Sequence, residues 1–182
     1  MGEIKSTLDL VMERTRNMTL SEEERREQSA ERFRRALDGL VQRFSEGSMK
    51  LSEAQREVAG LKTSNPAATD EAVREELLAR VPVEGAADGV LSLLREIGGM
   101  DPAPIIDLRS ACEAELREAM TRRMTERKDE LARDHGISGS AVVPNPRTDP
   151  AWGEQRRKIT ADYSAELDRL RAGLTGNTGN RL

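Results

Sequence analysis

The sequence contains very few aromatic side chains, so any core must be mainly aliphatic. Phe, Trp and Tyr make up only 2% of the 182 residues, whereas charged residues make up 34%, above the usual quarter or so. Aromatic side chains bury the largest area each, and a chain without them builds a thin core. A thin aliphatic core with many charges is typical of helical hairpins rather than of a sandwich or a doubly wound sheet. We therefore expect an all-α protein.

Cysteine and histidine occur once each, as Cys112 and His135. A single cysteine forms no intrachain disulfide and no cysteine-based metal site. A catalytic triad needs a nucleophile, a base and an orienting group within hydrogen-bond reach, and no such set is evident around His135. The glycine-rich phosphate loop that ends in Gly-Lys is also absent. The sequence predicts no cofactor, no metal and no known catalytic machinery, although an enzyme with an unfamiliar site stays an alternative.

Long apolar runs and an excess of positive charge are missing too. No stretch approaches the roughly 18–20 apolar residues that span a membrane, and the first residues do not form a signal peptide. The formal net charge is −4, and charged segments mix both signs: residues 21–35 hold five glutamates and five arginines. Such mixed runs are typical of solvated helix faces. We expect a cytoplasmic protein with no membrane partner, and the acidic balance argues against nucleic acid as a partner.

Capping residues and apolar periodicity predict five shorter helices in the first hundred residues. Ser21 with Glu24, and Ser52 with Gln55, have the spacing of a capping box. Thr69 is the expected N-cap of a later helix. The predicted helices cover residues 6–18, 21–47, 52–61, 69–80 and 85–97.

The sequence pattern over residues 101–174 predicts two long helices that pack antiparallel. Asp101-Pro102 and Asp149-Pro150 each have the form of an N-cap followed by a proline at the first helical position. Apolar residues recur every three or four positions over 105–131 and over 152–174, close to a heptad seam. The expected architecture is an elongated, coiled-coil-like antiparallel hairpin in the C-terminal half, packed with the shorter N-terminal helices.

The domain organisation follows from these helices. We expect residues 1–174 to form a single helical domain, in which 1–100 supply the shorter helices and 101–174 the hairpin. Residues 175–182 are rich in Gly, Asn and Thr and are expected to form a flexible tail.

The segment that joins the two long helices, residues 136–148, is longer than a helical hairpin needs. It carries Ile137, Val142 and Val143, and Trp152 lies shortly after it. These four residues are the candidate contacts with a partner. The alternative is that the loop folds back on the hairpin and buries the same side chains, with Trp152 as its anchor.

Two segments of the sequence resemble a known group of proteins. They are Gly2-Glu3-Ile4-Lys5-Ser6 with Leu8, Leu10, Glu13 and Thr15 after it, and Asp149-Pro150-Ala151-Trp152. With charged helices between them, these segments are similar to those of a group of uncharacterised bacterial proteins. The group has no assigned activity, so the resemblance implies only a bacterial, soluble, helical protein. Residues 45–100 take no part in it.

The sequence therefore favours a non-catalytic interaction, scaffold or adaptor protein of unknown pathway. It would bind another protein, or itself as a homodimer, by burying apolar stripes flanked by Glu/Arg pairs. Besides the loop residues, Phe33, Leu37 and Phe44 of the second predicted helix are possible contacts, and both sets can instead belong to the core. The alternative function is a ribosome- or nucleic-acid-associated factor, whose binding would fall steeply with salt.

Overall fold

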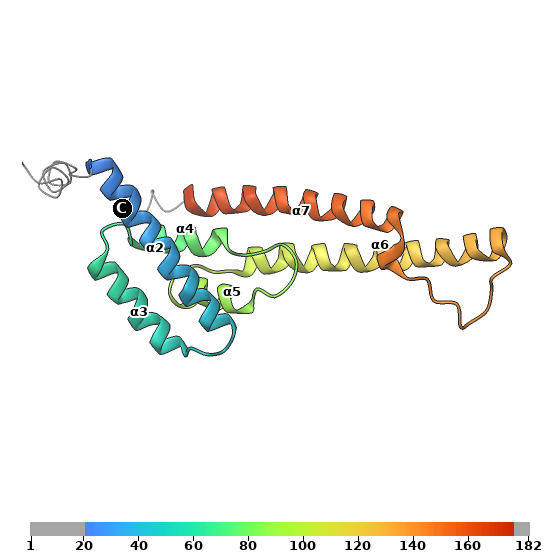
Figure 1. The fold of residues 1–182 in the computed structure, drawn as a ribbon, viewed down its shortest axis with the longest axis horizontal. Helices are drawn as coiled ribbons and strands as arrows, with labels where there is room; N and C mark the ends of the chain where they lie inside the picture. Colours follow the sequence, from blue (N-terminus) through green and yellow to red (C-terminus); the bar gives the residue numbers. More distant parts are fainter. Residues whose placement is uncertain (1–20, 177–182) are drawn as a thin grey trace, which may run out of the picture. The chain divides into compact units, whose positions relative to one another are not determined.

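A computed structural model describes residues 21–176 and contains only helices, turns and loops over that range (Figure 1). The all-α prediction is thus confirmed, while the helix predicted over 6–18 lies outside the described residues. The elements are α2 (Glu22–Ser45), α3 (Leu51–Ser64), α4 (Asp70–Ala79), α5 (Asp88–Glu96), α6 (Ala103–His135), the short 3₁₀ helix η1 (Pro146–Thr148) and α7 (Pro150–Gly176).

The chain divides into two compact units between Ala72 and Val73. The first unit contains α2 and α3, and the second contains α5 to α7, with the division falling inside α4. The single domain over 1–174 stays a prediction.

In the first unit, α2 and α3 pack their apolar stripes together. The core residues of α2 are buried and follow the predicted helical spacing. Two residues of α3 are buried with them. The predicted capping box at the start of α2 is confirmed: the Glu24 amide donates to Ser21 Oγ at 3.1 Å, and the Ser21 amide donates to Glu24 Oε2 at 2.7 Å. The buried set is Phe33, Leu37, Leu40, Ala54 and Val58.

The start of α3 differs from the prediction. The helix begins at Leu51 with Lys50 as N-cap, and the Lys50 amide donates to Glu53 Oε2 at 2.9 Å. The predicted box of Ser52 with Gln55 is therefore wrong. A carboxylate accepts from an orphan amide more strongly than a neutral side chain does, so Glu53 sets the start of the helix one residue earlier.

The two long helices of the second unit, α6 and α7, lie side by side and antiparallel, as predicted (Figure 1). Between them is a small cluster of Cys112, Ala119 and Ile159, against which Leu116, Trp152, Tyr163 and Val83 pack. The predicted start of α7 is confirmed, because the Ala151 amide donates to Asp149 Oδ1 at 3.1 Å. The start of α6 is one residue later than predicted, with Pro102 as N-cap.

The segment between α4 and α5, residues 80–87, is fastened to both long helices, and we call it the strap. Arg109 of α6 donates to the Gly85 carbonyl and Arg171 of α7 to the Val81 carbonyl. Glu84 accepts from Arg156 at 2.9 Å and from Thr160. These bonds hold the strap in a non-helical path, so α5 begins at Asp88 and the predicted start at residue 85 is wrong.

Candidate functional site

The hairpin tip, which we define as residues 124–149, extends past the start of α7. Arg123 Nε donates to Asp149 Oδ2 at 2.7 Å, which places the first turn of α7 beside Arg123. Residues 124–135 of α6 therefore project for about 18 Å, at about 1.5 Å per residue, as the orange end of α6 in Figure 1 shows. The loop 136–149 then connects the end of this projecting helical segment to the start of α7.

An ion-pair clamp of Arg123, Glu130 and Asp149 closes the tip. Arg123 also donates to Glu130 at 2.7 Å, and Arg127 donates to the same carboxylate at 2.8 Å. The guanidinium groups of Arg123 and Arg127 lower the pKa of Glu130 to about 2, with the larger effect from Arg123. The Arg123 guanidinium also lowers the pKa of Asp149. The carboxylates in turn raise the pKa of Arg123. The clamp is thus fully charged at neutral pH.

The loop has an ordered conformation built from turns. Gly136, with φ of 65°, ends α6 in the left-handed region, which glycine adopts without steric penalty. The Ile137 amide donates back to the Leu131 carbonyl at 3.1 Å. Asn145 Oδ1 accepts from the Arg147 amide at 3.0 Å at the start of η1. The loop therefore presents its side chains from a defined backbone rather than from a free chain.

The structure separates the four candidate contact residues. Ile137 is 48% exposed and Val143 is 81% exposed, so neither is covered by the rest of the described chain. Val142 is half-buried. Trp152 is also half-buried, and it packs against the cluster between α6 and α7. Of the further candidates, Phe33 and Leu37 belong to the core of the first unit, and Phe44 is half-buried.

A cleft lies between α6 and the loop, and its lining includes Pro144, the residue after the exposed Val143. Its volume is about 490 Å³, and both the projecting part of α6 and the returning loop contribute to its walls. Leu131 and Pro144 supply apolar surface, and Arg127, Asn145 and Thr148 supply polar groups. The tip therefore combines exposed apolar side chains, an adjoining cleft and a charged rim.

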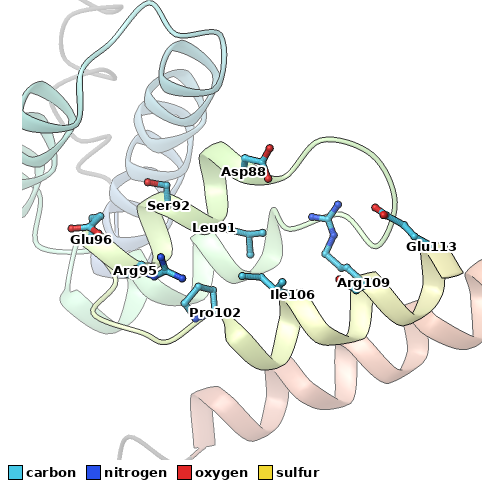
Figure 2. Close-up of a pocket in the computed structure, with 10 residues that line it drawn as sticks. Asp88, Leu91, Ser92, Arg95, Glu96, Pro102, Ile106, Arg109 and Glu113 are labelled. Carbon is cyan, nitrogen blue, oxygen red and sulfur yellow. The ribbon is translucent and has the colours of Figure 1, made fainter.

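A second concave site, the α5–α6 cleft, lies between α5 and the first half of α6 (Figure 2). Its volume is about 340 Å³. Figure 2 shows Leu91 of α5 and Ile106 of α6 facing each other, with Arg109 to one side and Arg95 to the other. The remaining lining residues are Asp88, Ser92, Glu96, Pro102, Ser110 and Glu113.

Arg109 is the unusual residue of the α5–α6 cleft. It is only 7% exposed and is the single buried charged residue in the part of the chain that the structure describes. Its guanidinium donates to the Gly85 carbonyl, and its Nε has no hydrogen-bond partner. Arg109 was not among the residues predicted from the sequence. The signal was available, because Arg109 falls four residues after Ile105 and three before Cys112, on the buried stripe of the helix.

The described residues offer little for metal or thiol chemistry. Within 21–176, no group of three or more His, Cys, Asp or Glu side chains is placed to hold a metal ion. Cys112 is buried, and that burial, with nearby Glu84 and Glu115, raises the pKa of its thiol. A thiolate, the reactive form, is therefore disfavoured. Among the described helices, none is both long enough and apolar enough to cross a membrane.

Comparison with known proteins returned no relative: no protein-family model, no curated protein and no solved structure matches the chain. The part of the chain that the structure describes is all-helical, and the chain has no recognised family or homologue.

Proposed function

We propose that this chain is a non-catalytic protein-interaction protein that recognises another protein through the hairpin tip. The observation that carries the proposal is the exposure of Val143 and Ile137 on an ordered loop at the end of a projecting helix. Single exposed apolar residues are common on protein surfaces. Here two β-branched side chains share one loop with a cleft whose lining is both apolar and polar, and this combination supports a docking surface.

The physical advantage of the tip is preorganisation. Burying one Val or Ile side chain contributes about 1.5–3 kcal/mol, and ordering a free loop on binding would cancel much of that gain. The Arg123–Asp149 bond and the turns around Gly136 and Asn145 already fix the loop. A partner that buries Ile137 and Val143 therefore gains apolar contact at a small entropic cost. The charged rim with Arg127 would set orientation, as charges around an apolar interface do.

Site-specific crosslinking followed by titration tests this proposal. A photoreactive residue at position 143 should capture a defined partner that mass spectrometry identifies, whereas the same residue at exposed position 117 of α6 should not. The purified partner should then bind the Ile137→Ser/Val143→Ser variant at least tenfold more weakly, and Ala141→Ser, a neighbouring exposed change, should bind like the parent. Equal binding by both variants would contradict the proposal. Capture of a second copy of the chain alone would replace a foreign partner by self-association.

One observation favours a second candidate function, binding of single-stranded nucleic acid. Arg147, Arg156 and Arg157 line the same groove as Trp152, and arginines beside an aromatic ring suit phosphates and a stacked base. Against this function, Arg156 already forms an ion pair with Glu84 at 2.9 Å, so it is less available to a phosphate. Trp152 is the only tryptophan, so the fluorescence of the protein reports directly on binding in this groove. Quenching by a single-stranded oligonucleotide, with an affinity that falls steeply as salt is added, would support this function. Unchanged emission would exclude it.

A further inference from the structure

A buried positive charge without a counter-charge is the least expected feature of the second unit. Arg109 is 7% exposed, and no carboxylate among the described residues forms an ion pair with it. An isolated charge is unfavourable in a low-dielectric interior unless it is paired or fully hydrogen-bonded. The guanidinium has five N–H donors, yet its Nε has no acceptor, and within residues 21–176 the guanidinium donates to the Gly85 carbonyl alone. An anion beside this group would supply the missing acceptors.

The surroundings of Arg109 provide space for such an anion. Arg109 lines the α5–α6 cleft, whose volume of about 340 Å³ falls within the range of small-molecule sites, about 300–1,000 Å³. Leu91 and Ile106 form an apolar surface next to the guanidinium (Figure 2). Arg95 lies on the other side of that surface, at the exposed rim. The site therefore offers one buried cation, an apolar surface and a second, solvated cation.

The carboxylates of the cleft restrict the charge of the ligand. Asp88, Glu96 and Glu113 also line it, so three acids face two arginines and the lining carries a formal charge of −1. A polyanion such as a nucleotide would be repelled by these acids. A single carboxylate is small enough to meet Arg109 alone, and it accepts two parallel bonds from a guanidinium.

We infer that the α5–α6 cleft binds a small amphiphilic monocarboxylate. The carboxylate group bonds to the Arg109 guanidinium, and the hydrocarbon part lies against Leu91 and Ile106. Glu113, one helical turn after Arg109, is the nearest competitor in sequence for the same guanidinium, but the structure shows no ion pair between them. This site is separate from the hairpin tip and does not depend on the proposed function.

Three probes separate the contributions to binding in the full-length chain. Octanoate has both the charge and the hydrocarbon, 1-octanol lacks the charge, and acetate lacks the hydrocarbon. Nuclear magnetic resonance follows the Nε–Hε signal of Arg109 and the δ1 methyl signal of Ile106. Octanoate should shift both signals saturably, while acetate and octanol should bind at least tenfold more weakly, because a charge-assisted hydrogen bond and hydrocarbon burial are each worth about a factor of ten or more. Octanol binding as tightly as octanoate, or no saturable shift with octanoate, would overturn the inference.

Variants give a second, independent test. Arg109→Met removes the cation at similar length and should weaken octanoate at least tenfold, whereas Arg117→Met, an exposed change on the same helix, should leave it unchanged. Retention of the wild-type affinity by Arg109→Met would overturn the inference. Glu113→Gln should strengthen octanoate a few-fold by removing a like charge; an unchanged or lower affinity would contradict a carboxylate at this position. The three-probe comparison on the unaltered chain remains decisive if Arg109→Met does not fold.

Discussion

The two ends of the α6–α7 hairpin are held together by different forces. At the end near α5, fully buried aliphatic side chains such as Leu93, Leu94 and Ile105 form the core. At the tip, α6 buries no side chain after Ala119, and the clamp of Arg123, Glu130 and Asp149 joins loop to helix instead. One end therefore depends on hydrophobic burial and the other on charge.

This difference predicts different responses to the same conditions. Added salt does not weaken hydrophobic burial, and moderate changes of pH affect it little. Ion pairs near the surface weaken when salt is added and when a low pH protonates their carboxylates. The tip should loosen while the remainder of the second unit stays folded, a form of local opening that is common in proteins.

The largest expected effect is a core deletion at the aliphatic end. Leu93→Ala should lower the free energy of unfolding of the second unit by about 2–5 kcal/mol, because Leu93 is fully buried and the change leaves a cavity. Leu131→Ala, a half-buried site at the tip, should lower it by less than about 1 kcal/mol. Denaturant unfolding followed by Trp152 fluorescence measures both. Equal losses would show that the two ends form one uniform core.

The next effect concerns the clamp. Arg123→Met should destabilise the closed tip by about 1–3 kcal/mol, because charge-assisted bonds to two carboxylates are lost. Hydrogen exchange should rise in the loop 136–149 and stay unchanged around Cys112. Arg122→Met, an exposed neighbour, is the matched control. Faster exchange around Cys112 would mean that the clamp also supports the hairpin core.

Acid should open the tip in a defined pH range. The Arg123 guanidinium lowers the pKa of Asp149, the carboxylate that joins the loop to α6, below its ordinary value of 3.8, and together with Arg127 it lowers the pKa of Glu130 from 4.5 to about 2. The opened tip therefore binds protons more readily than the closed tip. The clamp's contribution is complete above about pH 4.5 and is lost as the pH falls toward about 2. Carboxyl chemical shifts measure this titration directly. In Arg123→Met the pKa of Glu130 should move back up toward 4.5, and a value still near 2 would assign the shift to Arg127.

Local signals predicted the starts of α2 and α7 correctly, because the contacts that decide them are local. Ser21 with Glu24, and Asp149 with Pro150, mark helix starts because each cap contacts a residue two or three positions away. The predicted start of α5 was wrong because the strap before it is held by Arg109 and Arg171, which lie far from it along the chain.

The candidate site was less predictable for the same reason. Arg123 and Asp149 are 26 positions apart, and nothing in helical periodicity pairs them. Apolar character alone also did not distinguish Val143, which is exposed, from Trp152, which packs on the hairpin. Only the register of α7 against α6 decides which of these side chains reaches solvent.

The smallest expected effects come from two glycines, Gly136 inside the tip and Gly153 in the first turns of α7. Gly136 has φ of 65°, a region that costs an L-residue roughly 1–2 kcal/mol, so Gly136→Ala should destabilise the tip by about 1 kcal/mol. Gly153 lies inside α7, and a Cβ there meets no atom within 4 Å, so Gly153→Ala should stabilise the helix by about 0.5–1 kcal/mol. Hydrogen exchange of the loop and of the first turns of α7 measures the two separately. A loss of stability in Gly136→Ala and a gain in Gly153→Ala would show that the backbone at Gly136 sets the loop geometry independently of the clamp. No change of stability in Gly136→Ala would leave the clamp as the main determinant of the loop's path.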